Sequence, residues 1–106
     1  MLQSEHVTKP QLAFLRKLYL AHLIDDQQHN LLSLHKVTGM PRRTLQDAIA
    51  AFSDIGIEVE FVQDGVRNNA GHYRINTWGP VNSAWVGTHL SQIERLLHPQ
   101  AVIPSA

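Results

Sequence analysis

The spacing of apolar residues changes from helical to alternating at Gly56, and this change constrains the fold more than any other feature of the chain. Before it, Leu45, Ile49 and Phe52 recur at the spacing of one face of a helix. After it, residues 57–61 alternate strictly between apolar and acidic side chains, as a half-buried strand does. A change of period at a glycine predicts helices followed by a β-hairpin, and therefore an α+β fold.

A second alternating segment, residues 72–76, supplies the other strand of the predicted hairpin. The residues between the two segments are rich in Asp, Gly and Asn, which favour turns. Folding the hairpin about Arg67 predicts a register with Phe61 opposite Tyr73, Val59 opposite Ile75, and Glu60 opposite Arg74. This register gathers the apolar pairs on one face and the charge pair on the other, so we expect it to form.

Three helices are predicted before the hairpin. The first begins after the capping residue Thr8, runs to about Ile24, and carries two apolar stripes. A short helix over residues 32–38 is halted by Gly39, and a longer helix follows over residues 41–55. Because one packed face satisfies only one stripe, we expect the first helix to contact two surfaces. The second surface is either the carboxy-terminal helix of the same chain or a partner subunit.

A last helix is predicted over residues 81–98, where Pro99 ends it. Residues 99–106 are expected to be a flexible tail. A chain of 106 residues is long enough for one compact domain. We therefore predict a single domain over residues 1–98, in which the carboxy-terminal helix serves dimerisation.

Residues 32–61 have the element order of a winged helix-turn-helix: a short helix, a turn containing Gly39, a longer helix and a hairpin. Residues 39–57 resemble the helix-turn-helix of bacterial regulators of the deoxyribonucleoside-repressor and biotin-repressor types, which share the Thr-Leu pair after the turn and the Gly-Ile step into the wing. The whole chain resembles a small family of bacterial winged-helix proteins that are thought to bind DNA. The resemblance implies a three-helix core plus a β-hairpin wing, with an additional carboxy-terminal helix.

Two positions depart from that pattern. His35 stands where the first helix of the motif usually has alanine, so a larger side chain must fit there. Pro41 stands where a capping serine is common. Proline suits the start of a helix, but it removes one backbone N–H that could have held a phosphate.

The resemblance also implies a set of DNA-binding residues. The amino-terminal half of the second motif helix would enter the major groove, where an arginine can bond two acceptors of one guanine. The preceding helix and the wing tip would contact the backbone or the minor groove. The residues implied are Lys36, Pro41, Arg42, Arg43, Thr44, Gln46, Arg67, Asn68 and Asn69. Arg74 is left out because Glu60, its predicted neighbour across the hairpin, would neutralise it.

The function implied is sequence-specific binding of double-stranded DNA by a cytoplasmic transcription regulator. We expect a homodimer formed by the amino- and carboxy-terminal helices, each contributing its surplus apolar face. Nine basic residues are balanced by nine acidic ones, whereas affinity for phosphates comes largely from Lys and Arg. The neutral balance favours the alternative function, a winged-helix protein-interaction module without DNA binding.

Catalytic and metal-binding patterns are weak in this chain. It has no cysteine, no nucleophile beside an obvious base, and no phosphate-cradling loop, so we expect neither an enzyme nor a cofactor. Its seven histidines do not form the close helical pair of a zinc site. A metal-responsive regulator using His22, Asp25, Asp26 and His29 is a minor alternative. No segment has the pattern of a signal peptide or a membrane span.

Overall fold

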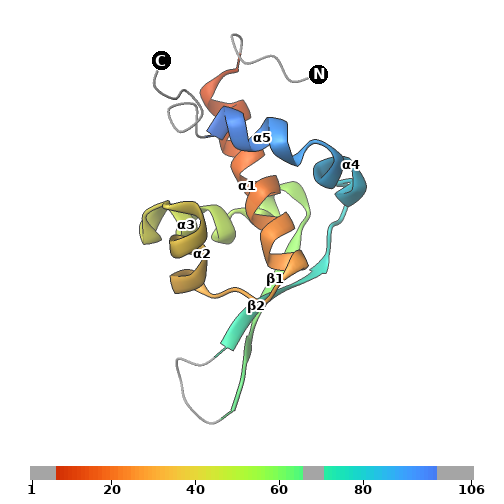
Figure 1. Ribbon diagram of the computed structural model, residues 1–106. Helices are drawn as coiled ribbons and strands as arrows, with labels where there is room; N and C mark the ends of the chain where they lie inside the picture. The colour runs from red at the N-terminus through yellow and green to blue at the C-terminus, as the bar shows by residue number, and fades with distance from the viewer. Residues whose placement is uncertain (1–6, 66–70, 98–106) are drawn as a thin grey trace.

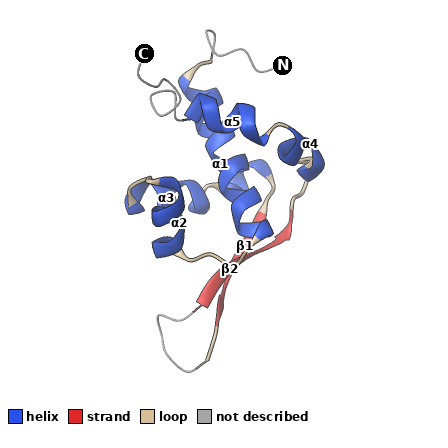
Figure 2. Cartoon of the chain, in the orientation of Figure 1, coloured by secondary structure: helices blue, strands red, loops and turns tan. Residues whose placement is uncertain are grey.

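The computed structural model describes residues 7–65 and 71–97. Within these ranges the helices form one body, and a two-stranded antiparallel hairpin projects from one end of it (Figure 1). Figure 2 shows the division between the helical part and the hairpin. The elements are α1 (Lys9–Asp26), α2 (Leu31–Thr38), α3 (Arg42–Ala50), the 3-10 helix η2 (Phe52–Ile55), β1 (Glu58–Gln63), β2 (Gly71–Thr77), α4 (Ser83–Thr88) and α5 (Leu90–Leu97). The predicted fold, a winged helix-turn-helix with additional carboxy-terminal helical structure, is confirmed.

Helix α1 is the central element of the fold. The Thr8 hydroxyl accepts from the backbone N–H of Gln11, whose side chain accepts from the backbone N–H of Thr8, so the helix begins with a capping box. It contacts α3 and β2 of the helix-turn-helix part, and also α4 and α5. The prediction that α1 contacts two surfaces is confirmed, and both surfaces belong to the same chain. Tyr19 connects α1 to α5, because its hydroxyl donates to Glu94 at 3.0 Å.

The helix predicted over residues 41–55 is divided in the structure. The α-helical part ends at Ala50, and the backbone tightens into η2. The N–H of Ala51 is shared between the carbonyls of Asp47 and Ala48, which is a common geometry where a helix changes pitch. Phe52 is fully buried as a result, and Gly56 ends the segment with a φ of +86°.

The hairpin has the predicted register from Val59 onward, and the pairing shifts by one residue between Glu58 and Val59. Phe61 lies opposite Tyr73, Val59 opposite Ile75, and Glu60 opposite Arg74. The polar segment at residues 27–30 adds a pairing to this sheet. His29 forms an isolated antiparallel bridge with Tyr73, and its carbonyl accepts from the Tyr73 N–H at 2.8 Å. Strand β2 is therefore the central strand, and β1 is the outer edge.

The prediction of a single helix over residues 81–98 is wrong, because the structure has two short helices, α4 and α5, in this region. Helix α4 begins at Ser83 after Asn82, whose side chain accepts from two backbone N–H groups. It ends at Thr88, and α5 begins at Leu90. Gly87 and Thr88 are weak helix formers, and they precede the break. The two short helices still bury one residue each, Val86 and Ile93, against α1.

One contiguous core joins all these elements. Its fully buried side chains come from α1, α2, α3, η2, α4, α5 and the segment before β1. They are Leu18, Leu20, Leu34, Leu45, Phe52, Ile57, Val86 and Ile93. This core fixes α3 and the base of the hairpin relative to each other.

Candidate nucleic-acid interface

The turn between α2 and α3 is held by three side-chain hydrogen bonds. Thr38 donates its hydroxyl to the carbonyl of Leu34 at 2.7 Å and accepts from the N–H of Met40 at 3.0 Å. The Nδ1–H of His35 donates to the carbonyl of Met40 at 2.8 Å. Gly39 takes a φ of +75°, which a glycine adopts without strain. The direction in which α3 leaves the turn is therefore fixed by side chains as well as by packing.

These bonds explain the histidine at position 35. Alanine, the usual residue of the resembling motifs, has no donor that could reach the carbonyl of Met40. His35 is exposed, so its ring reaches this carbonyl without entering the core, and the size of the side chain causes no clash. Met40 itself is buried beneath the turn. Sequence reasoning flagged His35 as a departure but did not find this role, because the bond connects residues across a turn whose geometry was not known.

Arg42 and Arg43 are the first two residues of α3, and both are exposed. Leu45 and Ile49 on the other side of the helix are buried, so packing orients the arginines toward solvent. The side chain of Arg43 is 86% exposed, and its Nε lies 3.7 Å from a carboxylate oxygen of Asp47 one turn later. An exposed pair at that distance is weak, which leaves Arg43 available to other acceptors.

The remaining predicted residues of this region lie close to the same turn. Lys36 on α2 and Gln46 on α3 are exposed, and Thr44 is half-buried. Pro41 is the N-cap of α3 and makes no side-chain cap bond, while its carbonyl accepts from the N–H of Leu45. Helices α2 and α3 pack against each other, so the two elements that carry these residues are neighbours. We call Lys36, Arg42, Arg43, Thr44 and Gln46 the basic edge.

The wing contributes aromatic residues beside this edge. The rings of Phe61 and Tyr73 meet edge to face, with centroids 5.2 Å apart. Burial raises the pKa of Tyr73, and the positive charge of Arg42 opposes that shift. Ile49 and Ala50, at the end of α3, line one groove together with Phe61 and Tyr73, so this end of the helix lies next to the hairpin. Sequence reasoning missed Tyr73 because it assigned this residue only to the apolar face of a strand.

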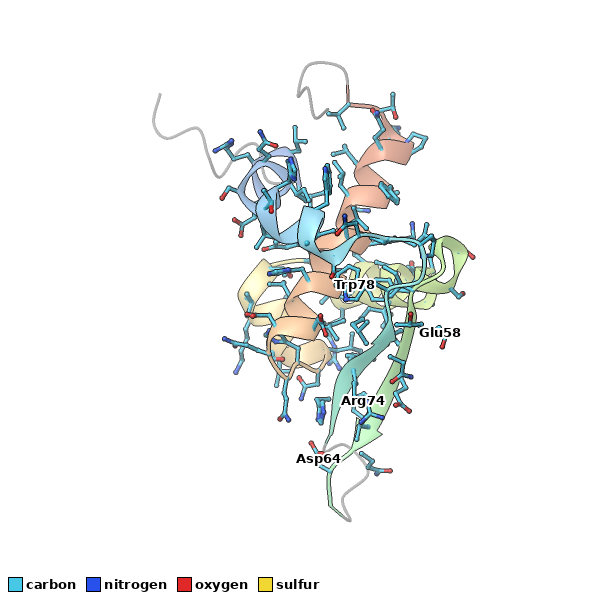
Figure 3. All side chains as sticks on the ribbon, turned by 90° about the vertical axis from the view of Figure 1, so that its right-hand side faces the viewer. Glu58, Asp64, Arg74 and Trp78 are labelled. Atoms are coloured by element: carbon cyan, nitrogen blue, oxygen red, sulfur yellow. The ribbon has the colours of Figure 1, made fainter. Side chains whose placement is uncertain are left out.

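The described part of the wing is dominated by paired charges and acidic residues. Arg74 forms an ion pair with Glu60, and His72 lies 3.1 Å from Asp64 (Figure 3). The expected pairing of Glu60 with Arg74 is confirmed. The predicted wing-tip residues Arg67, Asn68 and Asn69 lie outside the described residues.

The minor metal hypothesis finds no support in the described ranges. In residues 7–65 and 71–97, no three His, Cys, Asp or Glu side chains gather as a metal site requires. The Asp25 carboxylate accepts from the indole N–H of Trp78 at 3.1 Å, and the ring of His29 lies 2.9 Å from the Ser33 hydroxyl. Across the same described part of the chain, every helix is too short or too polar to span a bilayer.

Comparison with known proteins agrees with the geometry. A family described as winged helix-turn helix matches residues 9–97. A crystallised protein of the DUF2131 family from Shewanella amazonensis SB2B is 68% identical to this chain, with a TM-score of 0.85. The alignment covers 92% of this chain and 100% of that one. No curated protein matches the chain.

Proposed function

We propose that this chain, which belongs to the winged helix-turn-helix family, binds double-stranded DNA sequence-specifically and regulates transcription as a homodimer. The observation that carries the proposal is the exposure of Arg42 and Arg43 at the start of a helix whose direction is fixed by the turn before it. Had both arginines been buried or fully paired, the first turn of α3 would have offered no cation to a groove.

The basic edge has the dimensions and chemistry that a major groove requires. Helix α3 has nine residues, and its first turn carries both arginines. The amino-terminal turn of a recognition helix is the part that reaches base edges in this class of protein. In the proposed complex Arg42 and Arg43 contact guanines or phosphates, Gln46 contacts a base edge, and Lys36 and Thr44 contact phosphates. The wing tip, with Arg67, Asn68 and Asn69, would contact the backbone or the minor groove.

The zero net charge does not prevent this, because affinity depends on local charge. Phosphates are screened beyond about 8 Å at physiological salt, so distant carboxylates act weakly on them. The one exposed carboxylate of α3 is that of Asp47, one turn beyond the arginines. The proposed interface is therefore positively charged although the chain as a whole is not.

The proposed dimer uses an apolar surface formed by the amino-terminal helix and the carboxy-terminal part of the chain. Phe14 on α1 is 41% exposed, which is unusual for a large aromatic side chain. It borders a surface depression whose other residues are Leu18, Ile55, Pro80, Val81, Asn82 and Trp85. A two-fold contact here would orient two basic edges toward half-sites about 34 Å apart. We place the regulator in the cytoplasm, where its operator would be.

The decisive experiment measures affinity for random and genomic duplex DNA as a function of salt. We expect the logarithm of the binding constant to fall linearly with the logarithm of salt concentration, since each phosphate contact releases counterions. Replacing both arginines (Arg42→Ala with Arg43→Ala) should reduce that slope by about 2 and weaken binding at least 10-fold.

The matched control is Lys9→Ala, which removes an exposed positive charge at the far end of α1. It should leave the slope unchanged. Absence of DNA binding by the native protein at low salt, or an equal loss in the control, would refute the DNA-binding proposal. Dimerisation is tested separately by sedimentation: Phe14→Ser should shift the native dimer to a monomer, and a native monomer at all concentrations would exclude the dimer.

A further inference from the structure

We propose that the outer edge of β1 binds an extended segment of a partner protein in which basic and apolar side chains alternate, so that the segment adds a strand to the sheet. This interaction would use a different surface from the basic edge. It does not depend on DNA binding, and the experiment below separates the two.

The first observation is the position of β1 in the sheet. Strand β2 has β1 on one side and the His29 bridge on the other, whereas the ladder of β1 within the described residues involves β2 alone. Alternate residues of an edge strand direct their N–H and C=O groups away from the sheet, where another strand can pair with them. In Figure 3 Glu58 lies at the outer margin of the hairpin.

The second observation is a groove between α3 and the hairpin, next to this edge. Its volume is about 520 Å³, and it lies between the end of α3, the segment before β1, and the hairpin. Its lining is apolar at Ile49, Ala50, Ile57, Val59 and Phe61, and polar at Ser53, Glu58, Glu60, Tyr73 and Asn76. Phe61 is 45% exposed although it lies on the apolar face of the hairpin. A strand added to β1 would place every second side chain on this face, where apolar residues would cover Phe61 and fill the groove.

The third observation is the charge on the opposite face of β1. Glu58 and Glu60 alternate with Val59 and Phe61, so their carboxylates lie on the other side of the strand, and both are exposed. Glu60 is paired with Arg74, whereas the Glu58 carboxylate makes no ion pair with any described residue. Opposite charges on directly facing residues of neighbouring strands stabilise their pairing. A partner strand with a basic residue opposite Glu58 is therefore favoured.

The same charges argue against a second copy of this chain as the occupant. Antiparallel pairing of two β1 strands about Val59 would set Glu58 of each copy opposite Glu60 of the other. Like charges in facing positions destabilise such a pair. Natural sheets use charged edge residues in this way to prevent edge-to-edge association. The acidic residues of β1 therefore disfavour self-pairing in this register and favour a basic strand.

The test uses the full chain and a synthetic seven-residue peptide in which Lys and Val alternate, with blocked ends. Nitrogen-15 NMR titration should show shifts confined to β1, the neighbouring α3 residues and β2, together with slower hydrogen exchange of alternate β1 amides. Glu58→Gln and Phe61→Ser should each weaken binding about three- to five-fold. Arg42→Ala with Arg43→Ala should bind the peptide as the native chain does, even if it no longer binds DNA.

Two control peptides distinguish strand addition from simple charge attraction. One has the same composition with the lysines and valines in separate blocks, and the other is N-methylated at alternate residues, which removes the N–H donors along one edge. Both should bind at least 10-fold more weakly. Equal binding of either control, shifts centred on other elements, or self-association of the native chain through β1 would overturn the proposal.

Discussion

The basic edge and the outer edge of β1 differ both in charge and in the groups that they expose. The basic edge presents side chains, chiefly Arg42 and Arg43, from a helix whose entry turn is held by His35 and Thr38. The edge of β1 presents backbone groups between exposed carboxylates, beside the exposed ring of Phe61. The first arrangement suits a polyanion, and the second suits a basic strand.

The chain as a whole has no net charge, but the two surfaces carry opposite local charges. Equal numbers of basic and acidic residues are compatible with strong local charge when helix and strand segregate the two signs. Both surfaces rest on the same core, since Phe52 lies between α3 and β1 and is fully buried. Changes to the core should therefore affect both surfaces, whereas changes at the surface should affect one.

The largest expected effect is a loss of stability that disrupts both the basic edge and the β1 edge. Phe52→Ala removes a fully buried ring and should lower the free energy of unfolding by about 3–5 kcal/mol. Phe61→Ala deletes the same atoms from a half-exposed position and should cost about 1 kcal/mol. Urea denaturation of the two variants measures the difference. Equal losses would mean that the core does not support the two surfaces as described.

A smaller effect on stability and DNA affinity should distinguish the hydrogen bond in the turn from the charges beside it. His35→Ala removes the hydrogen bond to the Met40 carbonyl and should cost about 1 kcal/mol of stability, with a several-fold loss of DNA affinity. The matched variant Lys36→Ala removes a neighbouring charge and should reduce the salt slope by about 1 without loss of stability. Thermal denaturation and DNA titration together distinguish them. A stable His35→Ala protein with native DNA affinity would contradict the role of this bond.

A still smaller effect on DNA affinity should distinguish a carboxylate near the basic edge from one on the β1 edge. Asp47→Asn removes the carboxylate that lies 3.7 Å from Arg43, so DNA affinity should rise about two- to five-fold at 0.15 M salt. Glu58→Gln removes a carboxylate from the β1 edge and should change DNA affinity by less than about two-fold. Fluorescence anisotropy with one duplex compares the variants. A larger gain from Glu58→Gln would show that DNA reaches the β1 edge.

The smallest expected effect concerns the sheet on the side opposite β1. Burial lowers the pKa of His29 below its ordinary value of 6.5, and the charge of Asp26 opposes this shift. The unfolded chain therefore takes up a proton at higher pH than the folded chain does. This contribution to stability is complete above about pH 6.5 and is lost as the pH falls through the lowered pKa of the folded state.

Melting temperature against pH tests this expectation. Between pH 7 and 5 the native chain should lose more stability than His29→Gln, because the variant lacks the titrating ring. His22→Gln, which changes a half-buried histidine on α1, is the control and should follow the native curve. Identical curves for the native chain and His29→Gln would show that the His29 ring does not contribute.

Much of the fold could be predicted because local patterns specify it. The hairpin register follows from alternation, since a shift by one residue would expose every apolar side chain of the strand. The positive φ at Gly56 follows from a glycine at the end of an amphipathic segment. The exposure of Arg42 and Arg43 could also be predicted, because an Arg-Arg pair opposite buried Leu45 and Ile49 must face outward.

The features that could not be predicted depend on contacts between distant segments. The break between α4 and α5 has only weak local signals, and one long helix was the simpler prediction. The bridge between His29 and Tyr73 joins residues 44 positions apart, so no local pattern indicates it. The bond from His35 to Met40 depends on the exact shape of the turn.

The order of the elements, the pairing of the hairpin and the outward direction of the two arginines were determined by sequence alone, because each follows from a period of two or 3.6 residues and a glycine at its boundary. Which edge of the sheet stays open was decided only by tertiary structure. The polar segment before α2 pairs with β2 through His29, and among the described residues β1 pairs with β2 alone. That choice depends on how α1 directs the chain past the sheet, which is a property of packing in three dimensions.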